Sequence, residues 1–542
     1  MSTPLWEQQN NNEIVTPVRP EVLKYFLKGY DTAMADYLVA GFTYGFELHY
    51  EGPRQFRSSK NLLSALQNPV IVNKKLQKEL EAHRIVGPFV TLPFDNLQIS
   101  PIGIVPKKEE GQFRLIHHLS FPENSSINDF IPEVFTKVHY ATLDDAMNII
   151  VSLGKGCLIA KTDIESAFRI VPVCREDHEL LGFQWDGCFY FDKCLPMGCA
   201  SSCSIFEKFS SGLEWIGRVK GHIPHIVHVL DDFLFIGPPG SEICNQSLLV
   251  FRLICESLGV YLKEEKTFQA NTNLVFLGIE IDTVAMEIRL PEDKLVKLQK
   301  AIDAVKYKRK VCLRELQSLI GLLNFACLVI IPGRTFLRRL IDLTKGIAKP
   351  HHHKDLTKES RQDLAAWSLF INHFNGKSIL FKHIWKTSEQ LHLYTDAAGS
   401  WGFGAVFGRK WFYGAWPESM KEYNITLKEL FPIVVAVEVW GRVLQNSCVI
   451  FHSDNAAVVN IVNAQTSKDS KIMILVRRLV LALMKYNILF SAEHIPGLFN
   501  TLPDLLSRLQ VKKFLEVSLD SEDEPTAIPS HLLQLSKTQL LP

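Results

Sequence analysis

The sequence predicts a multidomain protein of the mixed α/β class. Three observations lead to this prediction: a length of 542 residues, two stretches in which strand patterns alternate with helical patterns, and carboxylates at the ends of several predicted strands. A chain of this length exceeds one hydrophobic core, so three or four domains are expected. With 47% hydrophobic and 22% charged residues, the composition is typical of globular proteins.

Composition and termini narrow the class further. The net charge of +1 does not by itself indicate a nucleic-acid binder, although an acidic centre can cancel a basic groove in the total. The N-terminus "MSTPLWEQQNNNEIV" lacks a secretory signal pattern. The longest apolar stretch, "LIGLLNFACLVIIPG", is too short to span a bilayer. We therefore expect an intracellular protein, cytoplasmic or nuclear, that is not secreted and has no transmembrane segment.

The predicted elements of the first half follow in chain order. Residues 20–86 are mostly helical, and "SPIGIVPKKEEGQFRLIHHLS" predicts two short strands joined by a charged turn. A helix over "ATLDDAMNIIVSLGKG" precedes a buried strand, "CLIAKTDI". The segment "LLGFQWDGCFYF" predicts a hairpin around an Asp-Gly turn. A helix follows, with Phe206, Phe209, Leu213 and Ile216 at helical spacing.

The second half begins with a helix, "RELQSLIGLLNFA", directly after the basic run "KYKRK". From about Leu391 a second α/β pattern predicts strands in "LHLYTD", "GFGAVFG", "CVIFHSD" and "NILFSAEH". Helices are predicted in "LFPIVVAVEVWGRVL" and "KIMILVRRLVLALMK". The tail from about residue 511 is acidic, and we expect it to be flexible.

Two adjacent aspartates interrupt the apolar run "HIVHVLDDFLFIG". Neighbouring side chains on a straight strand point to opposite faces, so Asp231 and Asp232 can share one site only at a hairpin turn. Asp can also be a simple turn former there. A third carboxylate, Asp163, ends the strand "CLIAKTD". Three such groups suit Mg²⁺, and a pair of these ions can promote an in-line phosphoryl transfer.

Four segments around these aspartates carry a resemblance to reverse transcriptases. They are "KTDIESAFRIVPV", "LPMGCASSCSIF", "HVLDDFLFIG" and "EEKTFQANTNLVFLGIEI", in the order and approximate spacing of the family's palm motifs. The resemblance implies that Asp163, Asp231 and Asp232 bind the metal ions; we call these residues the first carboxylate centre. It implies a fingers, palm and thumb polymerase of the right-hand type.

The same resemblance implies further substrate-binding residues. Phe168 would pack under the sugar and exclude a ribose 2′-OH, although it could also be an ordinary core residue. Lys107 or Lys108, with Arg114, would hold the triphosphate, and Lys266 would protonate the leaving pyrophosphate. The loop against the template and incoming base would consist of Leu195, Pro196, Met197 and Gly198. Cations of the thumb, in "KYKRK" and at Arg334, Arg338 and Arg339, would follow the phosphate backbone or form a solvated helix face.

The downstream α/β pattern resembles ribonuclease H. Asp396 and Asp454 end strands, Glu429 lies in "TLKEL", and Asp504 lies in "NTLPDLLSR". The resemblance implies that these four residues, here called the second carboxylate centre, bind two Mg²⁺ ions and that His494 helps the product leave. Two alternatives stay open: Thr426-x-x-Glu429 matches a capping box, and Asp454 can be a turn residue.

Three residues depart from the family patterns. Val229 stands where reverse transcriptases usually have Tyr, which affects fidelity or packing rather than metal binding. Pro432 falls where the ribonuclease H helix is already under way, and it removes a backbone hydrogen bond unless that helix begins near Glu429. Pro503 replaces a small residue before Asp504. The two prolines bear on the metal geometry of the second carboxylate centre.

The resemblance covers roughly residues 20–508 and is nearest to DIRS and Ngaro retrotransposons, which carry a tyrosine recombinase. It implies five regions: an N-terminal helical extension over 1–85, fingers and palm over 86–285, thumb and connection over 286–385, a ribonuclease H-like mixed-sheet domain over 386–510, and a flexible acidic tail over 511–542. No protease, integrase or recombinase pattern occurs, so a recombinase would be a separate partner protein.

The activity implied is RNA-directed DNA synthesis with hydrolysis of the RNA strand in the hybrid. Its cofactor would be Mg²⁺, with a two-ion centre in each catalytic domain. Its partners would be an RNA template, a DNA or RNA primer, the RNA–DNA hybrid and deoxynucleoside triphosphates, with no membrane. Two alternatives are a domesticated, non-catalytic nucleic-acid-binding protein and a ribonuclease H whose polymerase is inactive.

Overall fold

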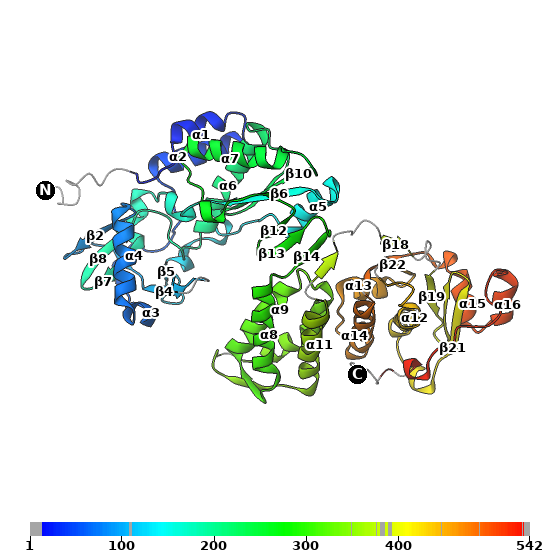
Figure 1. Ribbon diagram of the computed structural model, residues 1–542. Coiled ribbons are helices and arrows are strands. Elements are labelled where there is room, and N and C mark those ends of the chain that lie inside the picture. The colour runs from blue at the N-terminus through cyan, green and yellow to red at the C-terminus, as the bar shows by residue number, and fades with distance from the viewer. Residues whose placement is uncertain are drawn as a thin grey trace. The chain divides into compact units, whose positions relative to one another are not determined.

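A computed structural model describes residues 14–107, 111–347, 349–374, 377–379, 385–387, 393–445, 447–486, 488–533 and 535 (Figure 1). The chain divides into two compact units: Met1–Leu277 with Asp282–Ala285, and Gly278–Ile281 with Met286–Pro542. Both units combine helices with strands. The mixed α/β class predicted from the sequence is therefore confirmed, while the five finer regions remain proposals.

A four-stranded antiparallel sheet forms the centre of the first unit. Its strands, in spatial order, are β11 (Phe268–Asn271), β6 (Leu158–Asp163), β10 (Asp232–Gly237) and β9 (Ile226–Val229). Three helices pack against these strands: α5 (Leu143–Leu153), α6 (Ser202–Val219) and α7 (Ile243–Leu258). The predicted helical spacing holds, because Phe206, Phe209, Leu213 and Ile216 are all buried in one core.

A second, five-stranded sheet and a hairpin complete the first unit. The sheet has the order β1 (Arg57–Ser58), β3 (Gln98–Ile99), β7 (Gly182–Trp185), β8 (Cys188–Asp192) and β2 (Ile85–Phe89). The predicted charged hairpin is β4 (Ile102–Pro106) with β5 (Phe113–His117). The remaining helices and strand are α1 (Pro20–Phe26), α2 (Thr32–Tyr44), α3 (Leu63–Leu66), α4 (Pro69–Glu81) and β12 (Asn273–Phe276).

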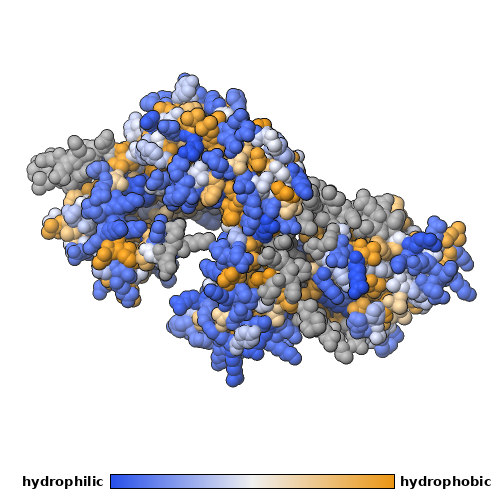
Figure 2. All heavy atoms as spheres, viewed as in Figure 1, coloured by the Kyte–Doolittle hydropathy of each residue, from blue (hydrophilic) through white to orange (hydrophobic). Residues whose placement is uncertain are grey.

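The second unit begins with a helical region. Its helices are α8 (Glu292–Lys306), α9 (Leu313–Ala326), α10 (Arg338–Thr344) and α11 (Lys358–Phe374). Strands β13 (Ile279–Asp282), β14 (Glu287–Arg289) and β17 (Lys377–Ile379) are neighbours in one sheet, and β15 (Lys310–Cys312) pairs with β16 (His353–Asp355). On the face drawn in Figure 2, the surface over α8 and α9 is mainly hydrophilic.

Two three-stranded sheets follow in the second unit. One is parallel, with the order β18 (Trp385–Thr387), β22 (Cys448–Ser453) and β23 (Leu489–His494). The other is antiparallel, with β19 (Leu393–Ala397), β20 (Gly402–Phe407) and β21 (Lys410–Ala415) in order. The helices here are α12 (Ile425–Trp440), α13 (Ala456–Ala464), α14 (Ser470–Lys485), α15 (Thr501–Ser507) and α16 (Val511–Val517).

The segment after residue 510 differs from the expected flexible tail. Helix α16 buries Phe514 against Trp411, with ring centroids 5.0 Å apart. Further on, the backbone N–H of Thr526 donates to the carbonyl of Trp411 at 2.7 Å. The acidic composition predicted a solvated tail, but one aromatic anchor on a short helix is enough to dock this segment on β21.

Membrane-spanning helices were not expected from the sequence. Across the part of the chain that the structure describes, none of the helices combines the length and the apolar character needed to cross a bilayer.

Candidate active sites

The first carboxylate centre lies where β6 meets the β9–β10 hairpin. Asp232 begins β10 and stands opposite Asp163, the last residue of β6. Val229 pairs with Asp232, so Leu230 and Asp231 form a two-residue hairpin turn. The backbone N–H of Ile164 donates to the carbonyl of Asp231 at 3.0 Å. The predicted turn therefore exists, and it brings three carboxylates from two strands to one edge of the sheet.

These carboxylates strongly affect one another's ionisation. Burial and the negative charge of Asp163 raise the pKa of Asp231 to about 6. Burial and Asp163 also raise the pKa of Asp232. Burial lowers the pKa of Lys266, but its hydrogen bond to Asp163 and the surrounding aspartates outweigh burial and raise it. An excess of buried negative oxygen donors favours a divalent cation, so the donor set fits the predicted Mg²⁺.

A cavity of about 230 Å³ is lined by four of the eight predicted substrate-binding residues: Lys107, Arg114, Pro196 and Met197. Lys107 and Arg114 come from the β4–β5 hairpin, while Pro196 and Met197 come from the loop after β8. Lys108 lies outside the described residues. Leu195 is buried below this loop. Gly198, with φ of +128°, passes so close to the carbonyl of His117 that a Cβ would collide with it.

The same cavity is lined by two lysines that sequence reasoning missed. Lys75 and Lys78 lie one turn apart on α4, before the hairpin that carries the predicted cations. Burial, Lys107 and Lys78 lower the pKa of Lys75. Cations that destabilise one another in this way favour a polyanion in the cavity. In the sequence, these lysines belong to an ordinary charged helical face, so no signal marked them.

Phe168 is half-buried and does not line this cavity. Its ring packs edge-on against Phe206, with ring centroids 5.3 Å apart, at the border of the core of the first unit. The structure therefore supports a packing contact for Phe168, and a contact with the sugar stays a prediction.

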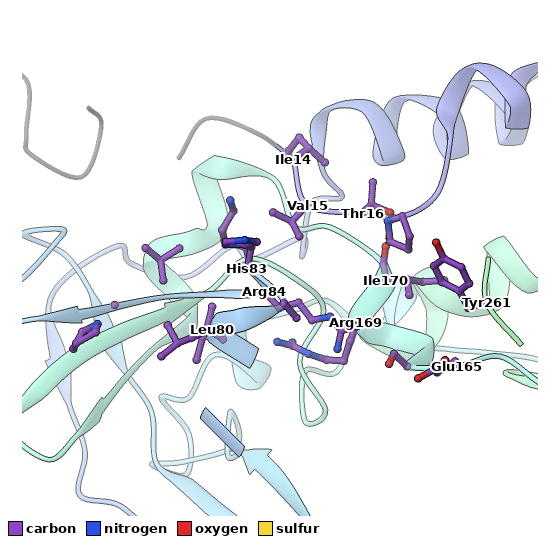
Figure 3. A pocket seen from close by; sticks show the side chains of 18 of the residues that line it. Ile14, Val15, Thr16, Leu80, His83, Arg84, Glu165, Arg169, Ile170 and Tyr261 are labelled. Carbon is purple, nitrogen blue, oxygen red and sulfur yellow. The ribbon is translucent and has the colours of Figure 1, made fainter. Parts of the chain in front are cut away.

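A larger cavity, of about 1300 Å³, adjoins the first one. Four residues line both cavities: Arg84, Ile85, Ser166 and Arg169. Figure 3 shows Ile14, Val15 and Thr16 of the N-terminal segment beside this cavity, together with Arg169 and Glu165. The Thr16 hydroxyl donates to the carbonyl of Ile170 at 2.6 Å, which fixes the segment against the strand-to-helix connection after Asp163.

The second carboxylate centre gathers three of its four residues tightly. Ligand oxygens of Asp396, Glu429 and Asp454 all lie within 4.8 Å of one another. Among the described residues, no other set of at least three metal-binding side chains is so close. Asp396 lies in β19, Glu429 in α12, and Asp454 directly follows β22. Three elements from different parts of the chain thus converge on one point.

The electrostatics of this centre also fit a cation. Burial and the charges of Asp396 and Asp454 raise the pKa of Glu429 to about 9. Burial, with Asp454 and Asp504, raises the pKa of Asp396 to about 6 against the opposing effect of Ser507. Ser507 donates to Asp396 at 2.6 Å. These oxygen donors suit Mg²⁺, which would relieve the repulsion among them.

Asp504 and His494 lie at the edge of this centre. Asp504 has 41% of its side chain exposed and accepts a 2.8 Å bond from Arg508. Its charge nevertheless contributes to the raised pKa of both Asp396 and Glu429. His494 ends β23, and its Nε2 lies 3.1 Å from the backbone carbonyl of Asp454. Gly404 of β20 lets α15 approach, since a Cβ there would collide with Leu506.

The capping-box interpretation of Glu429 is wrong. The N-cap of α12 is Asn424, whose side chain accepts a 2.8 Å bond from the N–H of Leu427. Asn is a stronger N-cap than Thr, so the helix begins at Ile425 and leaves Glu429 free to point into the centre. Pro432 is therefore interior to the helix and removes the hydrogen bond to the Lys428 carbonyl.

The other two departures have simple structural positions. Pro503 is the third residue of α15, where the N–H would have no partner within the helix. Val229 ends β9, next to the turn. Of the cations that were predicted for a thumb, Arg338 and Arg339 form ion pairs at 3.3 and 3.2 Å with Asp342 and Asp363. The buried Asp363 makes a structural role more fitting for Arg339 than a phosphate contact.

Known proteins resemble the part of the chain that contains the first carboxylate centre. Residues 105–281 match the family model for reverse transcriptase (RNA-dependent DNA polymerase). The Gag-Pro-Pol polyprotein of Mason-Pfizer monkey virus is 23% identical over 325 residues, which is 58% of this chain and 16% of the relative. A putative enzymatic polyprotein of Cassava vein mosaic virus is 24% identical over 366 residues, covering 64% of this chain and 52% of the relative.

One solved structure with a similar chain is the foamy viral protease-reverse transcriptase dRH in complex with double-stranded DNA. It has a TM-score of 0.49 and 16% identity, and the match covers 92% of this chain and 84% of that one. The curated relatives above are much longer than the part that this chain matches. The chain contains a reverse transcriptase domain of the type found in retroelement polyproteins.

Proposed function

We propose that this protein is an RNA-directed DNA polymerase with a ribonuclease H activity, which copies retroelement RNA into DNA and degrades the RNA strand of the hybrid. The single observation that carries the proposal is positional. The family match over residues 105–281 contains Asp163, Asp231 and Asp232, and the fold places these three carboxylates at one sheet edge.

In the polymerase reaction, the first carboxylate centre would hold two Mg²⁺ ions. When bound, they stabilise the attacking primer oxygen and the leaving pyrophosphate of an in-line displacement. Lys107, Arg114, Lys75 and Lys78 would hold the triphosphate, because they line one cavity. Lys266 is within hydrogen-bonding reach of Asp163. It carries a proton that it could donate to the departing pyrophosphate.

In the hydrolytic reaction, Asp396, Glu429 and Asp454 would hold the metal ions and Asp504 would complete the set. Ser507 orients the Asp396 carboxylate through its hydroxyl. The lysine before Glu429 is also buried, and its ammonium donates to the carbonyls of Gly399 and Lys421 at 2.5 and 2.7 Å. Lys428 thus anchors the turn after β19, and His494 stands at the open side, where it could assist product release.

The element type and partners belong to the same proposal. The segments "SPIGIVPKKEEGQFRLIHHLSFPENSSINDFI" and "HIPGLFNTLPDLLSR" support a DIRS or Ngaro-type retrotransposon with a tyrosine recombinase. The template would be the element's RNA, copied from a DNA or RNA primer with deoxynucleoside triphosphates. A recombinase on a separate chain would act on the DNA product.

Primer extension by the purified protein tests the proposal. We expect a labelled DNA primer on an RNA template to be extended in Mg²⁺, and the template to be cut within the hybrid. Cleavage without extension would indicate a ribonuclease H with an inactive polymerase. Tight binding of the hybrid without either reaction would indicate a non-catalytic nucleic-acid-binding protein.

A further inference from the structure

The turn that carries Asp231 has an unfavourable backbone conformation. Leu230 is the first of its two loop residues and has φ of +53°, in the left-handed region that a branched side chain rarely adopts. Two-residue hairpin turns favour Gly, Asn or Asp at such positions. Something outside the turn must therefore hold Leu230 in place, since a relaxed turn would move the neighbouring aspartates.

A buried glutamate of α6 makes that contact. The backbone N–H of Leu230 donates to Oε2 of Glu207 at 3.1 Å. The Glu207 side chain is 9% exposed, so its charge requires a partner. Its other oxygen, Oε1, lies 3.1 Å from Nε2 of His228 on β9. This second approach is a close ionic contact rather than an aligned hydrogen bond.

The contacts continue away from the turn. Nδ1 of His228 lies 2.5 Å from Oε2 of Glu214, two helical turns after Glu207 on α6. Glu214 in turn pairs with Arg218. Burial lowers the pKa of His228, but its two glutamate partners outweigh burial and raise it to about 9. His228 is therefore an imidazolium at neutral pH, with a carboxylate at each ring nitrogen.

We propose that Glu207 and His228 are positioning residues of the first carboxylate centre: Glu207 holds the Leu230 turn, and His228 holds Glu207. The inference rests on the proposed polymerase function. It goes beyond that function because neither residue belongs to the first carboxylate centre, and hydrogen-bond and ionic contacts join Glu207 and His228 to the turn and to each other. Glu207 fixes the backbone between Val229 and Asp231, and it thereby sets the direction in which Asp231 presents its oxygens.

The geometry separates positioning from simple core packing. If Glu207 and His228 only formed an ion pair within the core, Glu207 would not need to accept a hydrogen bond from the Leu230 N–H. A positioning role predicts a defect confined to the metal requirement of DNA synthesis. A packing role predicts a loss of folding stability that affects all activities of the chain together.

The test compares Glu207→Leu and Glu207→Gln with the matched control Glu214→Gln. Leu removes the acceptor for Leu230, Gln keeps a neutral oxygen that can still accept, and the control alters His228 without touching the turn. For Glu207→Leu we expect the Mg²⁺ concentration that half-saturates primer extension to rise by roughly 10- to 100-fold. The half-saturating Mg²⁺ concentration of Glu207→Gln should lie close to that of the wild-type protein, and Glu214→Gln should change this concentration least of the three variants.

Hybrid cleavage by the same chain serves as the internal reference and should be unchanged. The melting temperature of Glu207→Leu should fall, because the substitution breaks a buried ion pair with His228, and a melting curve shows that the variant is still folded at the assay temperature. An unaltered Mg²⁺ requirement in folded Glu207→Leu would overturn the inference. A parallel loss of both activities and of melting temperature would assign Glu207 to packing alone, which also overturns it.

The outcome is distinguishable from failure of the proposed function. Wild-type protein that does not extend the primer refutes the polymerase activity. The positioning is then decided by equilibrium titration with Mn²⁺ in an Asp454→Asn background, which disables the second carboxylate centre. Weaker Mn²⁺ binding in Glu207→Leu supports the inference, and equal binding contradicts it.

Discussion

Both carboxylate centres bring buried, negatively charged side chains close together, but they are built from different structural elements. The first is built at one end of a sheet from Asp163 of β6, Asp231 of a tight turn and Asp232 of β10, and Lys266 already balances part of its charge. The second collects residues from the ends of two strands and from two helices, and burial together with its own carboxylates raises the pKa of Glu429. The first centre is therefore sensitive to backbone geometry, and the second is sensitive to burial and mutual repulsion.

This contrast makes Glu429 the residue whose charge matters most. We expect Glu429→Gln to reduce hybrid cleavage by at least about 100-fold, because the neutral amide no longer offsets the metal charge. Without metal, the Glu429→Gln variant should melt at a higher temperature than the wild-type protein. Burial disfavours the ionised form of Glu429, whose pKa is about 9, and the neutral Gln does not carry that cost. Cleavage of a labelled RNA–DNA hybrid and a melting curve measure both effects.

The matched control is Glu438→Gln on the same helix. Glu438 accepts a 2.7 Å bond from Arg478 and lies in a structural ion pair. This variant should melt lower and still cleave the hybrid. If Glu429→Gln kept full cleavage, the second centre would be misassigned.

The centres should also differ in how pH changes their demand for Mg²⁺. Carboxylates must lose their protons to bind the metal. Above pH 7, Asp231 is largely ionised, with its pKa of about 6, whereas Glu429 titrates near 9. Raising the pH from 7 to 9 should therefore lower the half-saturating Mg²⁺ for hybrid cleavage by roughly tenfold or more. That for primer extension should change little.

The measurement is a Mg²⁺ titration of each activity at several pH values. If the two activities responded equally to pH, the pKa values of Asp231 and Glu429 would not differ in the way described above.

A smaller effect concerns substrate choice at the first centre. On the prediction that the Phe168 ring lies beneath the sugar, Phe168→Ala should increase ribonucleotide incorporation roughly tenfold. Competition between deoxy- and ribonucleotides in primer extension measures the change. Phe206→Leu disturbs the same aromatic contact from the fully buried side and should leave selectivity alone. Unchanged selectivity in Phe168→Ala would make Phe168 a core residue.

Much of the first centre could be predicted from the sequence. An apolar run precedes Leu230 and another follows Asp232. The few residues between these runs can form only a tight turn, so the sequence pattern alone predicts the hairpin. The match of Lys107, Arg114, Pro196 and Met197 to one cavity follows from motif order. Glu207 and His228 could not be found this way, because Glu207 is one of several charged residues of α6 and the sequence does not show which of them is buried against β9.

The second unit shows other limits of the sequence. Thr426-x-x-Glu429 matches a capping box, yet Asn424 two residues earlier is the stronger cap and starts the helix. The acidic tail predicted flexibility, while the burial of Phe514 depends on its packing against Trp411 and Leu506, residues that lie far from it or on another element and that only the tertiary fold brings together. Strand β21 was not predicted, although Gly408, with φ of +57°, begins a two-residue turn between Phe407 and Lys410.

The most direct test of the account is a double dissociation on one chain. Asp231→Asn should reduce primer extension by about 100- to 1000-fold and leave hybrid cleavage intact, while Asp454→Asn should do the reverse. Asp186→Asn, in the two-residue turn between β7 and β8, changes the same chemical group and should affect neither activity. Loss of both activities in either centre variant, with an unchanged melting curve, would contradict the claim of two independent metal centres.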